Sequence, residues 1–171
     1  MKTRSLEILF GSMVMLLSLS IINLAYGADA FSDTDKTFVG KVSQGGMYEV
    51  ELGKLAETKA VAQDIKDSAA TEVHDHQIVG DKLKSIMEAN GMTFPASLNA
   101  EFAARLAKMN DLPADQFDAA YLADMKKIHH ADGAAFAKEA KNGSNADLKA
   151  FAAETYRIVQ RHLGELNASV E

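Results

Sequence analysis

Cysteine is absent from this chain of 171 residues, and only two prolines interrupt it. Without cysteine, the chain can form no disulfide framework, and no lipid-attachment cysteine follows the apolar start of the sequence. Phosphate-binding loops, nucleophile triads and cofactor fingerprints are missing as well. Stability must therefore come from packing, to which a bound metal ion could add.

An excess of positive charge is also missing. The formal net charge is −6, and loss of the first residues, which include Lys2, Arg4 and Glu7, would make it more negative. This balance argues against a nucleic acid as the partner. The chain is 47% hydrophobic and long enough for one core of ordinary size, so a single globular domain is expected.

Long apolar runs are confined to the start of the chain. The run "ILFGSMVMLLSLSII" follows two basic residues and precedes "LAYGADA", in which Ala25 and Gly27 have the spacing of a cleavage site. It is shorter than the ~20 residues that cross a bilayer, so a signal peptide is favoured over the alternative of an uncleaved anchor. The mature chain is then expected in the periplasm or outside the cell, with no transmembrane helix.

Helical patterning dominates after the signal peptide. Three segments are expected: a signal peptide at 1–27, a disordered mature N-terminus at 28–34, and a helical domain at 35–168. Within this domain, apolar periodicity predicts long helices at about 33–58, 62–90, 113–142 and 145–168. Pro95 and Pro113 bracket a short connecting helix. Gly91 and Gly143 stand at the positions of C-terminal caps, and Asn145 or Ser144 at an N-cap.

Four long amphipathic helices without strand-like alternation indicate an all-α fold. The connections within the first pair and within the last pair are short, whereas the link between the pairs is long. We therefore expect a ferritin-like four-helix bundle with a short extra helix between helices 2 and 3. Spacing alone leaves a simple up-and-down path open.

Ionisable residues interrupt the apolar faces of these helices. On the second helix, positions separated by three and four residues define one face: Ile65, Ala69, Glu72, His76, Val79, Leu83 and Ile86. The same test places Glu49 on the inward face of the first helix, His129 on that of the third and His162 on that of the fourth. Each long helix therefore carries an ionisable group toward the core.

Such groups must meet one another, because burying an unpaired carboxylate costs several kcal/mol. Two arrangements remain open. Glu49 can accept hydrogen bonds from protonated histidine in a closed polar network, or Glu49, His76, His129 and His162 can hold a metal ion. Three imidazoles and one carboxylate suit zinc, iron, manganese or copper better than calcium.

Three further carboxylates are candidates to orient the ligand side chains: Glu72, Asp75 and Asp132. Of these, Asp75 fits a solvated surface better than a buried role. His74 lies about 160° around its helix from His76 and is expected to face solvent. His130 lies on a face next to that of His129, so the pair does not chelate by itself.

Several segments carry a resemblance to a known family: "FVGKVSQGGMYEVELGKLAETKA", "VAQDIKDSAATEVHDHQIVGDKLKSI", "FDAAYLADMKKIHHADGAAFAKEAKNGSNADLKAFAAET" and "RHL". Over about residues 36–167 the chain resembles the bacterial Domain of Unknown Function 4142 family. The resemblance implies an exported, ferritin-like helical bundle of a group often labelled membrane or outer membrane proteins. Its pattern of one glutamate and three histidines maps to Glu49, His76, His129 and His162.

The grouping with ferritins does not imply iron storage. The Glu-x-x-His motifs of di-iron ferritins are absent, because Val73, Lys126 and Val159 stand three residues before the three histidines. Three functions remain: an exported bundle with an internal Glu/His site, a metal-dependent enzyme with Glu49 as ligand or base, and a structural or partner-binding envelope protein without metal. The oligomeric state is left open.

Overall fold

The computed structural model describes residues 30–168, which are entirely helical apart from their connections. The helices are α1 (Asp33–Lys59), α2 (Gln63–Ala89), α3 (Ala100–Asp111), α4 (Ala114–Asn142) and α5 (Ala146–Ala168). They confirm the expected all-α class, the four long helices and the short extra helix. Among the described helices, none has the length and apolar character needed to cross a membrane. The predicted signal peptide lies outside the described residues.

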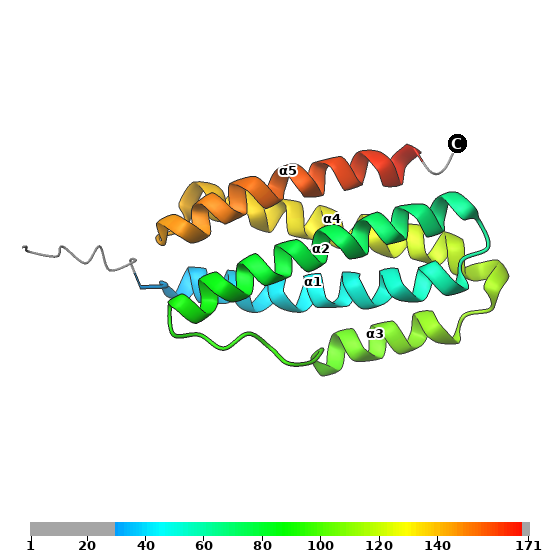
Figure 1. Cartoon of the computed structure of the whole chain (residues 1–171), viewed down its shortest axis with the longest axis horizontal. Helices are drawn as coiled ribbons and strands as arrows, with labels where there is room; N and C mark the ends of the chain where they lie inside the picture. Colours follow the sequence, from blue (N-terminus) through cyan, green and yellow to red (C-terminus); the bar gives the residue numbers. More distant parts are fainter. Residues whose placement is uncertain (1–29, 169–171) are drawn as a thin grey trace, which may run out of the picture.

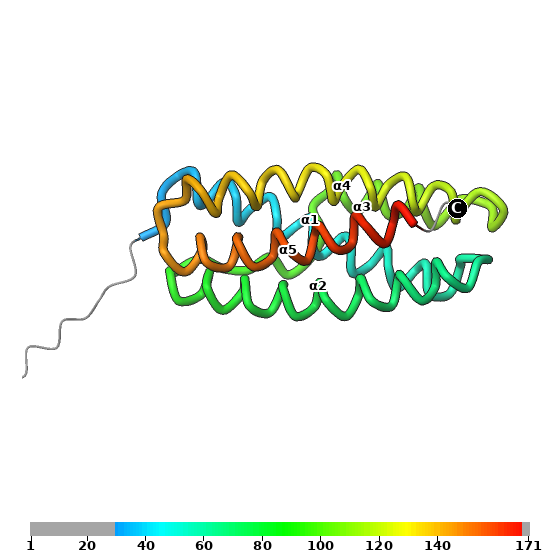
Figure 2. The backbone as a smooth tube through the Cα atoms, turned by 90° about the horizontal axis from the view of Figure 1, so that it is seen from above, coloured from blue at the N-terminus to red at the C-terminus, as the bar shows by residue number. Residues whose placement is uncertain are grey.

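The four long helices pack side by side along most of their length (Figures 1 and 2). α1 packs on α2, and α4 on α5. The two pairs meet through contacts of α1 with α4 and of α2 with α5. α2 and α4 run in the same direction, because the connection that contains α3 carries the chain back along the outside of the bundle (Figure 1). The chain therefore does not follow a simple up-and-down path.

Hydrogen bonds at the helix ends set the boundaries. Ser32 caps α1 in a reciprocal pair of bonds with Asp35, and Phe31 is buried just before it. The prediction of disorder over 28–34 is therefore wrong from Phe31 onward, since Phe31 is buried and residues 33 and 34 begin α1. Asn145 is the N-cap of α5, because its Oδ1 accepts from the backbone N–H of Leu148 at 2.9 Å.

The two expected glycine caps differ. Gly91 has a φ of +73°, as a left-handed cap requires. Gly143 is the C-cap of α4, as expected, but its φ of −57° is not left-handed. Glycine is needed here for close packing, because a Cβ at this position would lie 2.8 Å from the carbonyl oxygen of Glu139.

α3 is attached to the outside of the bundle by apolar packing and by Arg105. Met109 is buried, and Phe102 packs against the core. Arg105 donates to Oδ1 of Asp124 on α4 through Nε at 2.9 Å and Nη2 at 2.7 Å. Its guanidinium also lies over the ring of Tyr48 on α1, 4.7 Å from the ring centroid. These contacts fix the crossover segment to two long helices.

The core consists of two apolar clusters with a polar layer between them. One cluster is centred on Phe38, Phe136 and Phe151, and the other on Leu52 and Tyr121. Buried polar and charged residues lie between the clusters: Glu49, Glu72, His76, His129, Asp132, Thr155 and His162. All four long helices therefore carry buried polar groups at the same level of the bundle.

We predict that Gly53→Ala lowers the free energy of unfolding by about 1–3 kcal/mol, because the added Cβ would lie 2.7 Å from Cγ2 of Val73 and overpack the contact between α1 and α2. Gly40→Ala is the matched control. Gly40 is on the same helix with open space around it, so alanine should stabilise by about 0.5–1 kcal/mol. Chemical denaturation measures both values, and equal changes would contradict the close approach.

Candidate metal centre

Four buried side chains from three helices converge in the polar layer. Glu72 and His76 lie one turn apart on α2, His129 comes from α4, and His162 from α5. One ligand atom of each residue lies within 4.8 Å of the other three. None of the four residues is more than 6% exposed. The group is thus closed to bulk water and could hold a metal ion.

The distances within the group fit one ion. Oε2 of Glu72 lies 3.2 Å from Nε2 of His76, 3.2 Å from Nε2 of His129 and 2.8 Å from Nδ1 of His162. Nε2 of His129 and Nδ1 of His162 are 3.1 Å apart. A tetrahedron with metal bonds of about 2.0–2.1 Å has edges of about 3.3–3.4 Å, so small shifts would place all four atoms around zinc or a similar ion.

The other nitrogen of each imidazole faces a hydrogen-bond acceptor. Nδ1 of His129 lies 3.0 Å from the carbonyl oxygen of Met125, and Nε2 of His162 lies 2.9 Å from Oδ2 of Asp75. Nδ1 of His76 lies 3.4 Å from Oε2 of Glu49. Because these oxygens only accept, the ring protons belong on the outer nitrogens, and the inner nitrogens present lone pairs to the centre.

Asp75 therefore lies where it can orient His162, which is the role that the sequence left open for it beside the favoured solvated one. Arg161 reaches across the same carboxylate and pairs with Oδ2 of Asp75. Its Nη2 lies 3.2 Å from Nε2 of His162. Because a guanidinium has no acceptor atom, the carboxylate is the partner of the ring N–H and is itself held in place by the arginine.

The three histidines stabilise the anionic form of Glu72. Burial raises the pKa of Glu72, but the close contacts with His129, His162 and His76 outweigh burial and hold this pKa well below its usual range. Burial lowers the pKa of His76, which favours neutral imidazole. Burial also opposes the charged form of His162, but contacts with Glu72 and Asp75 outweigh it and raise the pKa of that ring.

Glu49 lies outside the group of four, although it was predicted as a ligand. Its Oε2 is 3.4 Å from Nδ1 of His76, and its Oε1 is 3.3 Å from Nδ1 of His129, so it borders the outer sides of two rings. Glu72, rather than Glu49, lies among the inner nitrogens of the three histidines. The signal that could have found it is the Glu-x-x-x-His spacing, which places Glu72 one turn from His76 on the same face.

Asp132 lies in the same layer but contacts none of the rings within ion-pair distance. Its nearest cation is Nζ of Lys41, 4.0 Å from Oδ1. Burial raises the pKa of Asp132 to about 6. The sequence prediction that Asp132 orients a ligand histidine is therefore not supported by a direct contact. His74 and His130 are exposed, as expected for His74.

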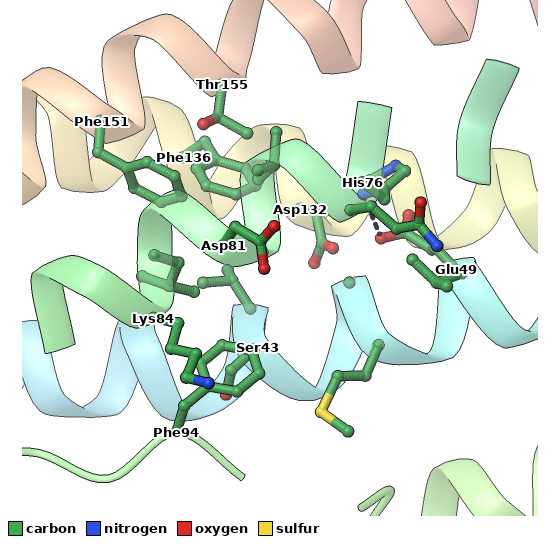
Figure 3. A pocket seen from close by; sticks show the side chains of 18 of the residues that line it. Ser43, Glu49, His76, Asp81, Lys84, Phe94, Asp132, Phe136, Phe151 and Thr155 are labelled. Carbon is green, nitrogen blue, oxygen red and sulfur yellow. Dashed lines mark ion pairs between the residues drawn. The ribbon is translucent and has the colours of Figure 1, made fainter. Parts of the chain in front are cut away.

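A cavity of about 400 Å³ opens beside the centre, between α1 and α2 (Figure 3). Glu49, His76 and Asp132 are among its lining residues. The cavity thus reaches the His76 side chain, whereas Glu72, His129 and His162 are not among its lining residues.

Comparison with known proteins agrees with the sequence pattern. The profile of the family described as Domain of unknown function (DUF4142) matches residues 24–168. The chain belongs to this family. No curated protein sequence matches the chain. A solved structure described as a DUF305 fragment from Deinococcus radiodurans is similar in fold, with a TM-score of 0.71 at 12% identity over 82% of this chain and 97% of that chain.

We predict opposite tautomers for two of the buried rings. His129 should carry its proton on Nδ1 and His162 on Nε2, because Met125 and Asp75 accept from these atoms. Long-range ¹H–¹⁵N correlation spectra of the imidazole rings measure this directly. Substitution of the exposed His74 and His130 by glutamine would leave only the buried rings in the spectrum. A proton on Nε2 of His129 would show that this nitrogen is no ligand.

Proposed function

We propose that this protein is exported and binds one transition metal ion through Glu72, His76, His129 and His162. Zinc, iron, manganese and copper all accept this combination of imidazole nitrogen and carboxylate oxygen. The observation that carries the proposal is the convergence of three imidazole lone pairs and one carboxylate oxygen on a single buried point. Glu49, Asp75 and the carbonyl of Met125 would then orient the ligand rings from outside.

Without a cation, this arrangement is unfavourable. Both carboxylate oxygens of Glu72 and Nε2 of His76 are buried and lack hydrogen-bond geometry to any partner within residues 30–168. They nevertheless lie as close as 3.2 Å to one another. A buried polar atom without a partner costs about 1–3 kcal/mol, and like lone pairs at this distance repel. A metal ion at the common point satisfies these atoms together.

A closed polar network is the competing interpretation. It needs protons between the carboxylate and the rings, and the raised pKa of His162 could supply one at the 2.8 Å contact with Glu72. That proton leaves the contacts of His76 and His129 unsatisfied, since their protons point outward. One added proton therefore makes one hydrogen bond, whereas a metal ion can bind all four ligand atoms.

We also propose that the bundle is of the ferritin-like type but holds one ion rather than two. The parallel course of α2 and α4 and the crossover through α3 support this topology. The Glu-x-x-His motifs of di-iron proteins are absent, and the described part of the chain brings only one group of at least three close ligands together. This argues for a single-ion site.

Mass-spectrometric metal analysis tests the site. We expect about one metal ion per chain in protein purified without a histidine tag from its native compartment, and loss of the metal in the double variant His76→Ala, His129→Ala. The matched control is His74→Ala, His130→Ala, which removes the exposed histidines from the same two helices. It should retain the metal.

Conservative variants distinguish the loss of metal ligands from unfolding of the protein. Glu72→Gln should abolish tight binding, whereas Glu49→Gln should weaken the affinity by about 10–100-fold, as expected of a residue that orients ligands. Circular dichroism reports whether each variant keeps its helices. Metal-free wild-type protein, or a metal content that is equal in wild type and in Glu72→Gln, would favour the polar network and a role in binding protein partners.

Export makes a separate prediction about the first residue. N-terminal sequencing of the protein from a periplasmic fraction should begin at Ala28, because Ala25 and Gly27 provide the small residues that precede a cleavage site. The variant Ala25→Leu, Gly27→Leu should accumulate uncleaved. An intact N-terminus in the wild-type cytoplasmic fraction would contradict export.

A metal-dependent enzyme is the second candidate function. The cavity favours it, because a small molecule there would lie beside His76 and Glu49. Such an enzyme requires that the ion accept an additional ligand from the cavity side, whereas a closed four-ligand site would be structural.

A further inference from the structure

The cavity beside the metal centre has the composition of a binding site for a small molecule. Its volume of about 400 Å³ lies in the range of about 300–1,000 Å³ that is usual for such sites. Most of its walls are apolar, with Leu83 from α2, Phe136 and Phe151 from the opposite helices, and Phe94 from the connection after α2 (Figure 3).

Carboxylates outnumber cations in this cavity. Glu49 and Asp132 lie at its inner end, and Glu51, Asp81 and Lys84 are exposed residues at its mouth. Glu51 is paired with Lys54, whose Nζ lies 2.8 Å from Oε1 of Glu51. The inner end therefore has two carboxyl groups and no lysine or arginine among its lining residues.

The inner carboxylates lack full compensation. Glu49 is 1% exposed, and its Oε1, which lies 3.3 Å from Nδ1 of His129, lacks hydrogen-bond geometry to any partner in the described part of the chain. Asp132 is 4% exposed, and Lys41 approaches only its Oδ1, at 4.0 Å. Its Oδ2 lies against the backbone of α1, where a Cβ on Gly45 would come within 3.0 Å. Buried carboxylates in this state favour a positively charged or hydrogen-donating neighbour.

We propose that the cavity binds a small organic cation, namely a primary amine with an apolar body. The ammonium group would lie between the carboxyl groups of Glu49 and Asp132. The apolar body would lie among Phe136, Phe151 and the other apolar walls. An ammonium offers three donors and one positive charge, which match the two acidic side chains at the inner end of the cavity.

The alternatives fit less well. A carboxylic acid would bring a third acidic group to the inner end of the cavity, and an alcohol would offer one donor without charge. This inference goes beyond the proposed metal site and does not depend on it, because the four inner ligand atoms of that site face away from the amine position. Metal content and amine binding are thus separate measurements.

Isothermal titration of the mature chain with three probes of equal length tests the proposal: 4-phenylbutylamine, 4-phenylbutanol and 4-phenylbutyrate. We expect the amine to bind at least tenfold more tightly than the alcohol, and the acid more weakly than both. Asp132→Asn should remove most of the preference for the amine. Equal affinities for the three probes, or no binding of the amine, would overturn the proposal.

A pair of glycine variants locates the binding. Gly46 lines the cavity, and Gly40 lies on the same helix outside it. A Cβ at either position meets nothing within 4 Å. Gly46→Leu should reduce amine affinity at least tenfold, whereas Gly40→Leu should leave it unchanged. Equal losses in the two variants would exclude the cavity as the site. Metal analysis of the same samples shows whether the metal centre is intact, so a failure of one proposal is distinguishable from a failure of the other.

Discussion

The burial of the Glu72 carboxylate among three imidazole rings in the middle of the bundle is the constraint on which the rest of the structure depends. The carboxylate lies between two apolar clusters and is contacted by side chains from α2, α4 and α5. A buried charge requires partners with good geometry, and removal of one partner leaves a penalty of several kcal/mol. The relative rotation and register of these helices are therefore constrained more tightly here than by the interchangeable apolar contacts on either side.

Much of this fold could be predicted from the sequence, because its signals are local. The apolar periodicity of residues 62–90 specified which face of α2 is buried, and Asn145 was recognisable as a cap from residue type and position. Gly143 was recognised as the cap of α4, but the sequence did not show that the need for glycine there comes from the neighbouring Glu139 and not from the backbone angle.

The candidate site was predictable only in part, for a physical reason. Periodicity showed that Glu49, Glu72 and the histidines point inward, but it does not specify how far a helix is displaced along its partner. That displacement decides whether Glu49 or Glu72 reaches the inner nitrogens. Asp75 was underestimated because it is only partly buried and pairs with Arg161, a residue that lies 86 positions away. Such contacts exist only after the helices have packed.

Glu49 lies between the candidate metal centre and the cavity. Its Oε2 faces His76 and its Oε1 faces His129, and the same residue lines the cavity. A change of charge or position at Glu49 would act on both sides at once: on the orientation of a ligand ring and on the lining of the cavity. This shared residue offers a route by which an occupant of the cavity could alter the metal centre without contacting the ion.

The four ligand atoms are divided equally between two helical hairpins. Glu72 and His76 belong to the hairpin of α1 and α2, and His129 and His162 to that of α4 and α5. Each hairpin can form from contacts that are close in the chain, but neither alone contains the set. Capture of the proposed ion must therefore follow the docking of the hairpins. The metals that are available where this last assembly step takes place, rather than where the chain is synthesised, would decide which ion the protein acquires.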